Sequence, residues 1–313
     1  MRIARSLPDA SGFAPSAVTI GNFDGVHAGH QQLFQEVVRA AREMNARPTV
    51  LTFDPHPARV VAPHRAPRLL TSIEERCELM GRSGIEQVLL LPFDAEISRL
   101  SPEEFVRQIV AGQLGARVVL VGDNFRFGHK QSGDTRMLAE LGTRYGFETR
   151  IVGAVKSRGR VVSSSEVRGL VEAGEVAKAC RFLGRPYAIA GEVVHGRGIG
   201  AKQVVPTLNL RTGSEVLPKN GVYITRTRDL DAGRRWNSIT NLGVRPTFGG
   251  DPELSIETFL LEPLEGDAPA RIRLEFLRRV RDEKKFETPE ALKAQVLHDA
   301  ARAQTYFRRI SGL

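Results

Sequence analysis

The sequence reads TIGNFDGVHAGH over residues 19–30. Its first two residues end the run SAVTI at residues 16–20. This run is largely apolar and β-branched, as buried strands are. The glycines, asparagine and aspartate at 21–25 predict a turn, and apolar residues then recur at helical spacing at 33, 34, 37 and 38. His27 and His30 therefore lie at the start of a predicted helix. A helix N-terminus attracts phosphate through its unpaired N–H groups and its macrodipole, and imidazoles there can donate hydrogen bonds to a developing phosphate charge.

The first 180 residues alternate between strand-like and helical segments. Apolar runs occur at residues 16–20, 48–53, 87–91, 117–121 and 149–152, and helical patterns at 31–44, 72–83, 102–113 and 135–145. This alternation is typical of βαβ units in a doubly wound parallel sheet, an α/β fold of Rossmann-like type. Such sheets bind ligands at the carboxyl ends of their strands. Residues 21–30 follow the first apolar run and are expected at that end.

The alternation of strands and helices stops after a predicted helical connector at residues 164–183. Short β-type stretches separated by Gly/Pro turns follow at 187–195, 221–227, 236–242, 255–261 and 271–276. They indicate an antiparallel barrel or sandwich, of which we predict the small β-barrel. Thr288 and Pro289 then fit the N-cap and first position of a C-terminal helix. We expect one domain at 1–182 and a second at 183–313.

Composition narrows the class of protein. No apolar run is as long as the roughly 18 residues of a membrane span, and the N-terminal residues lack the apolar core of a signal peptide. The two cysteines, Cys77 and Cys180, are far apart, which favours a reducing, cytoplasmic location over a disulfide framework. The net charge is +9, but the densest basic cluster, at 278–281, is followed at once by Asp282 and Glu283. We therefore expect no membrane and no nucleic acid as partner; a homo-oligomer stays open.

Three further polar clusters follow predicted strands or open a helix. They read TFDPHP at 52–57, VGDNFRFG at 121–128 and VSSSEVR at 162–168. The alternating Phe125 and Phe127 can line a flat aromatic ligand or simply belong to the core. Hydroxyl and N–H groups at the start of a helix, with Arg168 one turn further, suit a triphosphate. A proline-stiffened loop and an ordinary serine N-cap are the alternatives for the first and third clusters.

The second half carries a Gly-rich segment, HGRGIG at 195–200, and PTLN at 206–209. Thr207 and Asn209, two residues apart, project to one side of a strand, and their oxygens are ligands that Mg²⁺ accepts beside ATP phosphates. Glu257 is a carboxylate on an otherwise apolar strand, so it is a candidate general base for a hydroxyl nucleophile. A polar strand face and a solvent-facing glutamate are the alternatives.

Taken together, these clusters resemble the prokaryotic bifunctional riboflavin kinase/FAD synthetases. Residues 21–30 are similar to the GxFDxxHxGH signature of nucleotidyltransferases, and with the three following clusters they resemble the FMN adenylyltransferase domain over residues 16–180. PTLN resembles the PTAN-type motif of the riboflavin kinase domain. The chain departs from the family pattern with Ser165 for threonine, with Leu208 for alanine, and at Ala201 and Val204 around the Gly-rich segment.

The resemblance implies a role for each candidate residue. His27, His30 and Arg168 would stabilise charge during adenylylation, and Glu257 would be the base of the kinase step. The remaining residues divide into three groups. ATP and its phosphates would be bound by Gly21, Asn22, Phe23, Asp24, Gly29, Ser164, Ser165, Gly196, Gly200 and Lys202; the flavin by Phe53, Pro55, His56, Asn124, Phe125, Phe127 and Arg245; and Mg²⁺ by Thr207 and Asn209.

The resemblance also implies the reactions: riboflavin and ATP give FMN and ADP, and FMN and a second ATP give FAD and pyrophosphate. Residues 241–248, with Arg245, are expected to form a loop over the substrates. Three alternatives stay open: an adenylyltransferase whose kinase domain is weakened by the departures at Ala201 and Val204, a transferase with another acceptor, and a flavin- or RNA-binding regulator.

Overall fold

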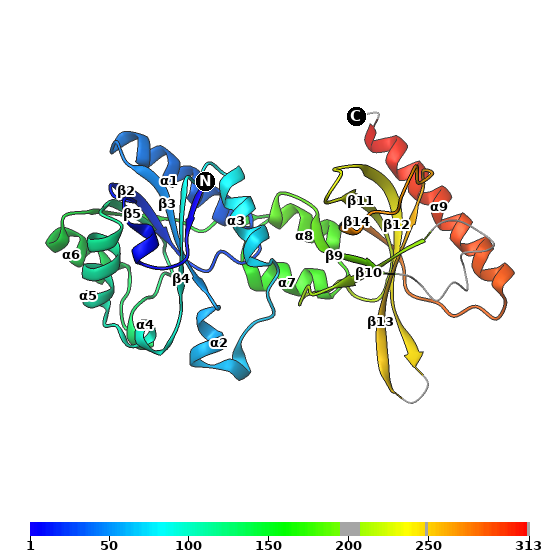
Figure 1. Ribbon diagram of the computed structural model, residues 1–313, viewed down its shortest axis with the longest axis horizontal. Helices are drawn as coiled ribbons and strands as arrows, with labels where there is room; N and C mark the ends of the chain where they lie inside the picture. The colour runs from blue at the N-terminus through cyan, green and yellow to red at the C-terminus, as the bar shows by residue number, and fades with distance from the viewer. Residues whose placement is uncertain (195–206, 248–249, 312–313) are drawn as a thin grey trace. The chain divides into compact units, whose positions relative to one another are not determined.

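The computed structural model describes residues 1–194, 207–247 and 250–311, of which 245–247, 250–253 and 311 are described as backbone only. The chain divides into two compact units, Met1–Ser164 and Ser165–Leu313 (Figure 1). Each unit is a separate fold with its own core. The domain boundary expected between residues 182 and 183 stays a prediction. No helix in the described ranges is long and apolar enough to cross a membrane.

The first unit contains a six-stranded sheet in the order β1-β4-β3-β2-β5-β6, and every pairing in it is parallel. The predicted doubly wound parallel sheet is therefore confirmed. Its strands are β1 (Arg2–Ala4), β2 (Ser16–Ile20), β3 (Arg47–Asp54), β4 (Gln87–Pro92), β5 (Ala116–Gly122) and β6 (Glu148–Val152). The sequence analysis missed β1, because three residues are too few to show a period.

The helices of this unit cover both faces of the sheet. They are α1 (Ala28–Glu43), α2 (Pro57–Val61), α3 (Ile73–Arg82), α4 (Ala95–Arg99), α5 (Pro102–Phe105) and α6 (Thr135–Tyr145), with a π-helix η3 (Val106–Gln113), short 3₁₀ turns η1 (Pro8–Ala10), η2 (Pro63–Arg65) and η4 (His129–Gln131), and the hairpin β7 (Lys156–Ser157) and β8 (Arg160–Val161). The periodicity at 102–113 predicts a helix but not its i→i+5 bonding.

Alternation along the strands separates two cores. In β2, Ala17 packs in a cluster with α1 and α3, whereas Val18 packs in a second cluster with α5, η3 and α6. Successive strand residues point to opposite faces, so the two clusters lie on the two sides of the sheet. β2 is central, and the strand order reverses there: β3 and β4 follow on one side of it, and β5 and β6 lie on the other. Ligands of doubly wound sheets bind at such a switch point.

The second unit begins with two helices, α7 (Ser164–Glu172) and α8 (Val176–Leu183). The helical connector predicted over 164–183 is therefore present, but it is broken into two helices at residues 173–175. Gly174 adopts φ +78°, a left-handed conformation that ends the first helix. A β-carbon there would also lie 2.8 Å from the Arg279 Cδ.

The rest of this unit is a closed antiparallel barrel in the order β10-β13-β12-β11-β14-β9. It confirms the barrel rather than the sandwich. The strands are β9 (Tyr187–Val194), β10 (Thr207–Thr212), β11 (Gly221–Asp229), β12 (Arg235–Thr247), β13 (Gly250–Leu260) and β14 (Arg271–Arg281). Residues 241–247 continue β12 and pair with β13, so the loop expected there is a strand. The physical reason is that these residues lie opposite β13, where their backbone N–H and C=O groups are paired in the antiparallel ladder.

The C-terminal helix α9 (Pro289–Ser311) packs on the outer face of the barrel. Its Ala303 and Phe307 join a cluster with Ile224 and Ile239. The Arg281 Nε donates to the buried Asp299 carboxylate at 2.8 Å. The Thr288 Oγ1 accepts from the Ala291 N–H at 3.2 Å and Pro289 is the first helical residue, as predicted from the sequence.

The barrel interior is partly polar. Five fully buried hydroxyls form a hydrogen-bonded chain with O···O distances of 2.8–2.9 Å: Thr227, Ser238, Thr225, Thr240 and Thr258. Because a hydroxyl can both donate and accept, these four hydrogen bonds give each of the five buried hydroxyls at least one partner. The reactive side chains of this unit are therefore to be sought on the outer face.

Candidate functional site

The turn between β2 and α1 holds the first candidate site. Its backbone has positive φ at Phe23 (51°), Gly25 (78°) and Val26 (40°). Phenylalanine and β-branched valine rarely adopt such angles. The turn is held from outside by the Gly25 N–H, which donates to the Thr71 Oγ1 at 3.0 Å. The strained turn places the Phe23 ring against Gly21, the residue after the end of β2.

His27 and His30 form one stacked pair at the N-terminus of α1. Their ring centroids are 3.6 Å apart and their planes are inclined by 19°. His27 is the N-cap residue, and its Nδ1 accepts from the His30 N–H at 3.3 Å. Phe23 packs its ring against the edge of His30 at 5.1 Å between centroids. The structure therefore brings together the two residues that the sequence analysis assigned to charge stabilisation.

Glycines make room for this stack. A β-carbon at Gly29 would lie 3.3 Å from the His27 ring, and one at Gly21 would lie 3.0 Å from the Phe23 ring. Both distances are tighter than ordinary packing, so these positions need glycine for close approach. The assignment of Gly21 and Gly29 to phosphate stays a prediction; their packing against the rings is the contact that the structure gives.

The imidazole of His30 is neutral at pH 7. Burial lowers its pKa well below 6.5, and the neighbouring His27 and Arg76 lower it further. The His30 Nδ1 is buried without a hydrogen-bond partner. The His27 Nδ1 accepts a backbone N–H, so a neutral His27 ring carries its proton on Nε2. His30 is therefore a neutral ring that carries one N–H donor.

Asp24 is bound by the chain itself. Its carboxylate accepts from the Leu70 N–H at 2.9 Å and from the Thr71 N–H at 3.2 Å. The buried guanidinium of Arg76, on α3, lies 3.7 Å away. Asp24 is 4% exposed and Arg76 is 2% exposed. These contacts make Asp24 the anchor of the turn, and its predicted contact with ATP stays a prediction.

The loop after the next strand, β3, contributes His56, the N-cap residue of α2. Its Nδ1 accepts from the Ala58 N–H at 3.2 Å at the start of α2, and its Nε2 lies 3.0 Å from the Asn22 side-chain nitrogen position. With Nδ1 accepting, a neutral ring carries its proton on Nε2, so Asn22 must present its amide oxygen there. His56 and Asn22, 34 residues apart, therefore meet at the carboxyl edge of the sheet. Phe53 and Pro55, which flank this strand end, were also assigned to flavin; Phe53 meets Phe93 edge-on at 5.5 Å.

The segment Asn124–Phe127 follows the end of β5 at Gly122. Asn124 is exposed, and Phe125 and Phe127 stack with centroids 5.5 Å apart. Phe127 is buried and belongs to the core, where a β-carbon at Gly133 would lie 2.7 Å from its ring. Of the two phenylalanines, the half-buried Phe125 alone has an exposed part to offer to a ligand. For Phe127 the structure agrees with the core interpretation that the sequence left open.

The serine cluster begins at the end of the first unit. The Ser164 Oγ donates to the Asp24 carbonyl at 2.9 Å, so it joins the turn across 140 residues of sequence. Ser165 and Arg168 lie further along α7, in the second unit. The roles predicted for these three residues stay predictions.

In the second unit, the strand register places three polar residues of the barrel side by side. Asn209 pairs with Glu257 across β10 and β13, and Glu257 pairs with Asn241 across β13 and β12. Directly paired residues of antiparallel strands share a face, so the three side chains form one row. Ile256 and Thr258, on either side of Glu257, are buried, which confirms its opposite phase. Glu257 Oε1 also accepts from the Ser255 hydroxyl at 3.0 Å.

Thr207 lies two residues before Asn209, and Leu208 between them is buried, as predicted. The face therefore offers hydroxyl, amide and carboxylate oxygens, the hard ligands that suit Mg²⁺. Within the described ranges no three His, Cys, Asp or Glu side chains gather into a metal site. A cation here would need phosphate oxygens to complete its shell, which is usual for Mg²⁺ bound with a nucleotide.

Some predicted residues lie outside the described ones. Gly196, Gly200 and Lys202 are among them, as are the departures at Ala201 and Val204. Arg245 is described as backbone only, within β12.

Two relevant residues were missed from the sequence, Thr71 and Arg76, which anchor the first site. Asn241 was expected in a loop over the substrates and instead extends the row at Glu257. Arg76 had a signal: it takes the buried face of α3 together with Cys77 and Met80, where the period calls for an apolar residue. The pairing of Asn241 with Glu257 had no signal, because it depends on strand register.

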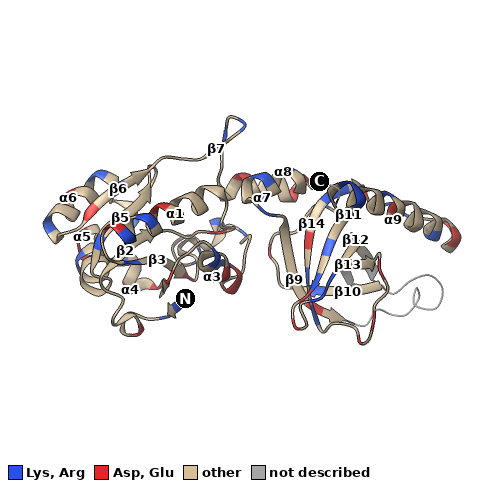
Figure 2. Cartoon of the chain, turned by 90° about the horizontal axis from the view of Figure 1, so that it is seen from above, with Lys and Arg blue, Asp and Glu red and all other residues tan. Residues whose placement is uncertain are grey.

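Two arginines of the basic cluster at residues 278–281 form hydrogen bonds and ion pairs within the second unit. Arg279 donates to the Asn220 carbonyl at 2.6 Å and to Asp282 at 2.7 Å, and Arg281 pairs with Asp299. Figure 2 shows residues of both charge signs on α9. This differs from a fully solvated basic face, because two of the arginines hold the loop and the helix against the barrel.

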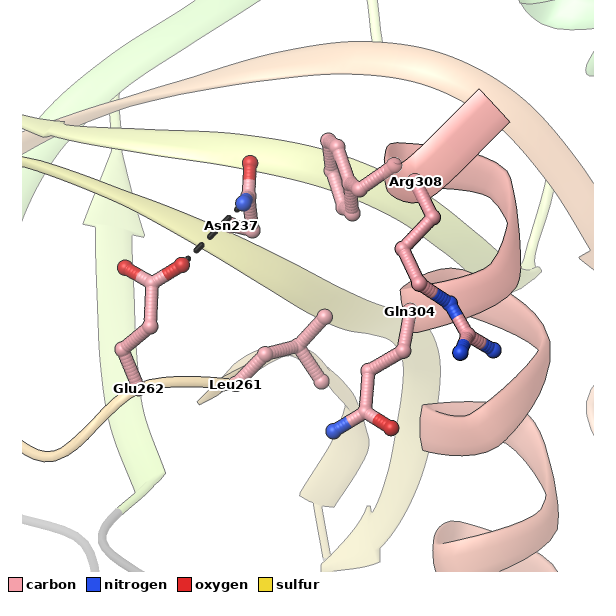
Figure 3. Close-up of a pocket in the computed structure, with 6 residues that line it drawn as sticks. Asn237, Leu261, Glu262, Gln304 and Arg308 are labelled. Atoms are coloured by element: carbon pink, nitrogen blue, oxygen red, sulfur yellow. Dashed lines mark hydrogen bonds between the residues drawn. The ribbon is translucent and has the colours of Figure 1, made fainter. Parts of the chain in front are cut away.

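A cavity of about 410 Å³ lies between the barrel and the end of α9 (Figure 3). It is lined by Asn237, Leu261, Glu262, Gln304, Phe307 and Arg308. The Asn237 amide donates to Glu262 at 3.0 Å across its wall. None of the residues predicted to bind substrate lines this cavity.

The stacked histidines at a helix N-terminus, beside the switch point of a parallel sheet, define the first unit as a nucleotidyltransferase-type fold; a six-stranded barrel with a polar row follows it. Comparison with known protein families agrees with both units. The FAD synthetase family model matches residues 10–166, and the riboflavin kinase family model matches residues 183–307.

Similar proteins match over nearly the whole chain. The bifunctional riboflavin kinase/FMN adenylyltransferase of Pseudomonas fluorescens is 36% identical over 287 residues, 91% of each chain. That of Escherichia coli K12 is 32% identical over 290 residues, 93% of this chain and 92% of the other. A crystal structure described as a macrolide-efflux protein from Streptococcus pneumoniae superposes with a TM-score of 0.86 at 26% identity, covering 97% of this chain and 98% of the other.

The chain belongs to the family of bifunctional riboflavin kinase/FMN adenylyltransferases. It is an enzyme of FMN and FAD biosynthesis with both transferase activities. ATP and the flavins are its substrates and products.

Proposed function

We propose that each unit carries one reaction, with the residues assigned from the sequence as its working groups. The second unit phosphorylates riboflavin, and the first unit adenylylates the FMN that results. The stack of His27 and the neutral His30 at the N-terminus of α1 supports the adenylyltransferase half. The row of Asn209, Glu257 and Asn241 supports the kinase half. We place both reactions in the cytoplasm.

In the kinase step, the Glu257 carboxylate takes the proton of the terminal ribityl hydroxyl. The hydroxyl oxygen then bonds to the γ-phosphorus of ATP, and the bond from that phosphorus to the ADP oxygen breaks. Positioning and charge stabilisation dominate phosphoryl transfer. Thr207 and Asn209 supply oxygens that would hold Mg²⁺, which when bound neutralises phosphate charge.

In the adenylyl step, a phosphate oxygen of FMN bonds to the α-phosphorus of ATP and pyrophosphate leaves. Negative charge grows on the α-phosphate oxygens. The imidazole N–H groups of His27 and His30 donate to those oxygens. The charge-stabilising role that the resemblance gives to Arg168, on α7, stays a prediction. His56 and Asn22, joined at the sheet edge, position the flavin side of the site.

A time course of the protein with riboflavin, ATP and Mg²⁺, resolved by chromatography, tests this proposal. The expected result is FMN followed by FAD. FMN that never advances to FAD refutes the assignment of the first unit. FAD from supplied FMN, without product from riboflavin, refutes a working kinase and implicates the departures at Ala201 and Val204.

A further inference from the structure

Arg76 is the least exposed arginine of the described first unit and is assigned no role in either reaction above. Its side chain is 2% exposed, and its Nε is buried without a hydrogen-bond partner. Burying a guanidinium is costly unless a charge or hydrogen bonds compensate it. The compensation here is incomplete: one terminal nitrogen lies 3.7 Å from Asp24 and donates weakly to the Thr71 carbonyl at 3.4 Å. An apolar residue would fill this helix position at lower cost.

The partners of Arg76 lead directly to the histidines. Asp24 is part of the turn that ends at His27, and it binds the N–H groups of residues 70 and 71. Thr71 in turn accepts from Gly25, the glycine of that turn. The positive φ at Phe23 and Val26 makes the turn unfavourable unless surrounding contacts hold it. Arg76 thus contacts Asp24 and Thr71, the two residues that hold the turn before the histidine pair.

We propose that Arg76 is a positioning residue for FMN adenylylation, acting through Asp24 on the strained turn that presents His27 and His30. This inference rests on the proposed function of the first unit. It assigns the residue no contact with substrate.

The charge of Arg76 also reaches His30. The groups that lower the His30 pKa are burial, His27 and Arg76, in that order. Burial lowers the pKa of Arg76 itself; the charges of Asp24, Cys77 and Asp54 act in the opposite direction, and Arg59 lowers the pKa further. The positive charge of Arg76 helps to keep His30 neutral, so its removal raises the pKa of His30. Activity that depends on neutral His30 will then be lost at a higher pH than in the wild type.

The test compares Arg76→Met, Arg76→Lys and a control, Arg82→Met. Arg82 lies on the same helix but is exposed and pairs with Glu78 at 2.5 Å. FAD formation from FMN and FMN formation from riboflavin are measured in the same preparations. We expect Arg76→Met to lower kcat for adenylylation roughly ten- to hundredfold, because misplacement of catalytic groups acts on the transition state. The KM for ATP and the kinase rate should stay near wild type.

The acid limb of the adenylylation pH profile supplies the decisive readout, since its position does not depend on how much of the variant is folded. It should move to higher pH in Arg76→Met and return toward the wild type in Arg76→Lys, which keeps the charge. Arg82→Met should leave rate and limb unchanged. A wild-type limb and a wild-type kcat in Arg76→Met overturn the proposal. So does a rate loss in both Arg76 variants with an unmoved limb, which marks a structural role alone. A wild-type enzyme that cannot adenylylate FMN refutes the proposed function instead.

Discussion

His30→Ala is the substitution that separates the two activities most sharply. The ring it removes is stacked on His27 at 3.6 Å and packed against Phe23 at 5.1 Å. The variant loses one neutral donor to the α-phosphate oxygens but leaves the second unit untouched. We expect FAD formation from FMN to fail while FMN formation from riboflavin continues at its normal rate.

The magnitude follows from what the ring does. Loss of one donor that stabilises charge in the transition state costs about 2.7–4 kcal/mol, or roughly 10²–10³ in kcat. Removing a buried ring also costs stability, about 1–3 kcal/mol by the apolar area it covers. That cost is partly offset because the buried Nδ1 has no hydrogen-bond partner to lose. We therefore expect the kcat for adenylylation, measured with both substrates saturating, to fall further than the unfolded fraction of His30→Ala can explain.

The pH dependence of stability gives an independent check. The folded-state pKa of His30 lies well below 6.5, so below that pH the unfolded chain binds a proton that the folded chain does not. The contribution of His30 to the unfolding free energy thus falls as the pH falls from about 6.5. His30→Ala lacks this term, so its thermal transition should move less between pH 7 and pH 5 than that of the wild type.

The assay follows both flavin products by chromatography in one preparation, with His30→Asn as the matched variant that keeps a side-chain N–H donor. An intermediate rate for His30→Asn is expected. Adenylylation by folded His30→Ala at a rate near the wild type would refute the role given to His30. An equal loss of both activities would instead indicate that the substitution damages the whole chain.

Three further predictions concern the second unit. Glu257→Gln should lower FMN formation by roughly 10²–10⁴ and spare adenylylation, whereas Glu192→Gln, an exposed glutamate of the same barrel paired with Arg211, should leave both rates unchanged; an unchanged kinase rate in Glu257→Gln removes it from the role of base. Asn209→Ala should raise the Mg²⁺ concentration needed for half-maximal FMN formation about tenfold or more, measured by Mg²⁺ titration at fixed ATP, and an unshifted titration speaks against Asn209 as a ligand. Asp299→Ala should lower the free energy of unfolding by about 3 kcal/mol because it leaves the half-buried Arg281 without its partner; urea unfolding measures this, with the exposed Arg302→Ala on the same helix as control, and equal midpoints for the two variants would contradict it.

The architecture of the first unit could be predicted from local pattern. Apolar runs with helices between them give a parallel sheet because only buried strands are apolar on both faces, and α6 (Thr135–Tyr145) and β2 (Ser16–Ile20) have the predicted bounds. The failures have local causes too. β1 is too short to show a period, and the connector breaks at Gly174, whose left-handed conformation no periodicity reveals.

The candidate residues divide in the same way. The histidine pair follows from sequence alone, because residues three apart at a helix start share a face and a dipole. The phases of Glu257 and Leu208 follow from the two-residue period of a strand. These are properties of neighbours in the chain, and pattern is enough to predict them.

Only the tertiary structure could decide the rest. Arg76 meets Asp24 across 52 positions, His56 meets Asn22 across 34, and Asn241 joins Glu257 through barrel register. Each contact depends on strand order, or on a register in which a shift of one residue would turn the side chain to the other face. A single sequence carries no record of those distances. It therefore determined the chemistry of this enzyme's reactive groups, while the fold determined what surrounds them and holds them in place.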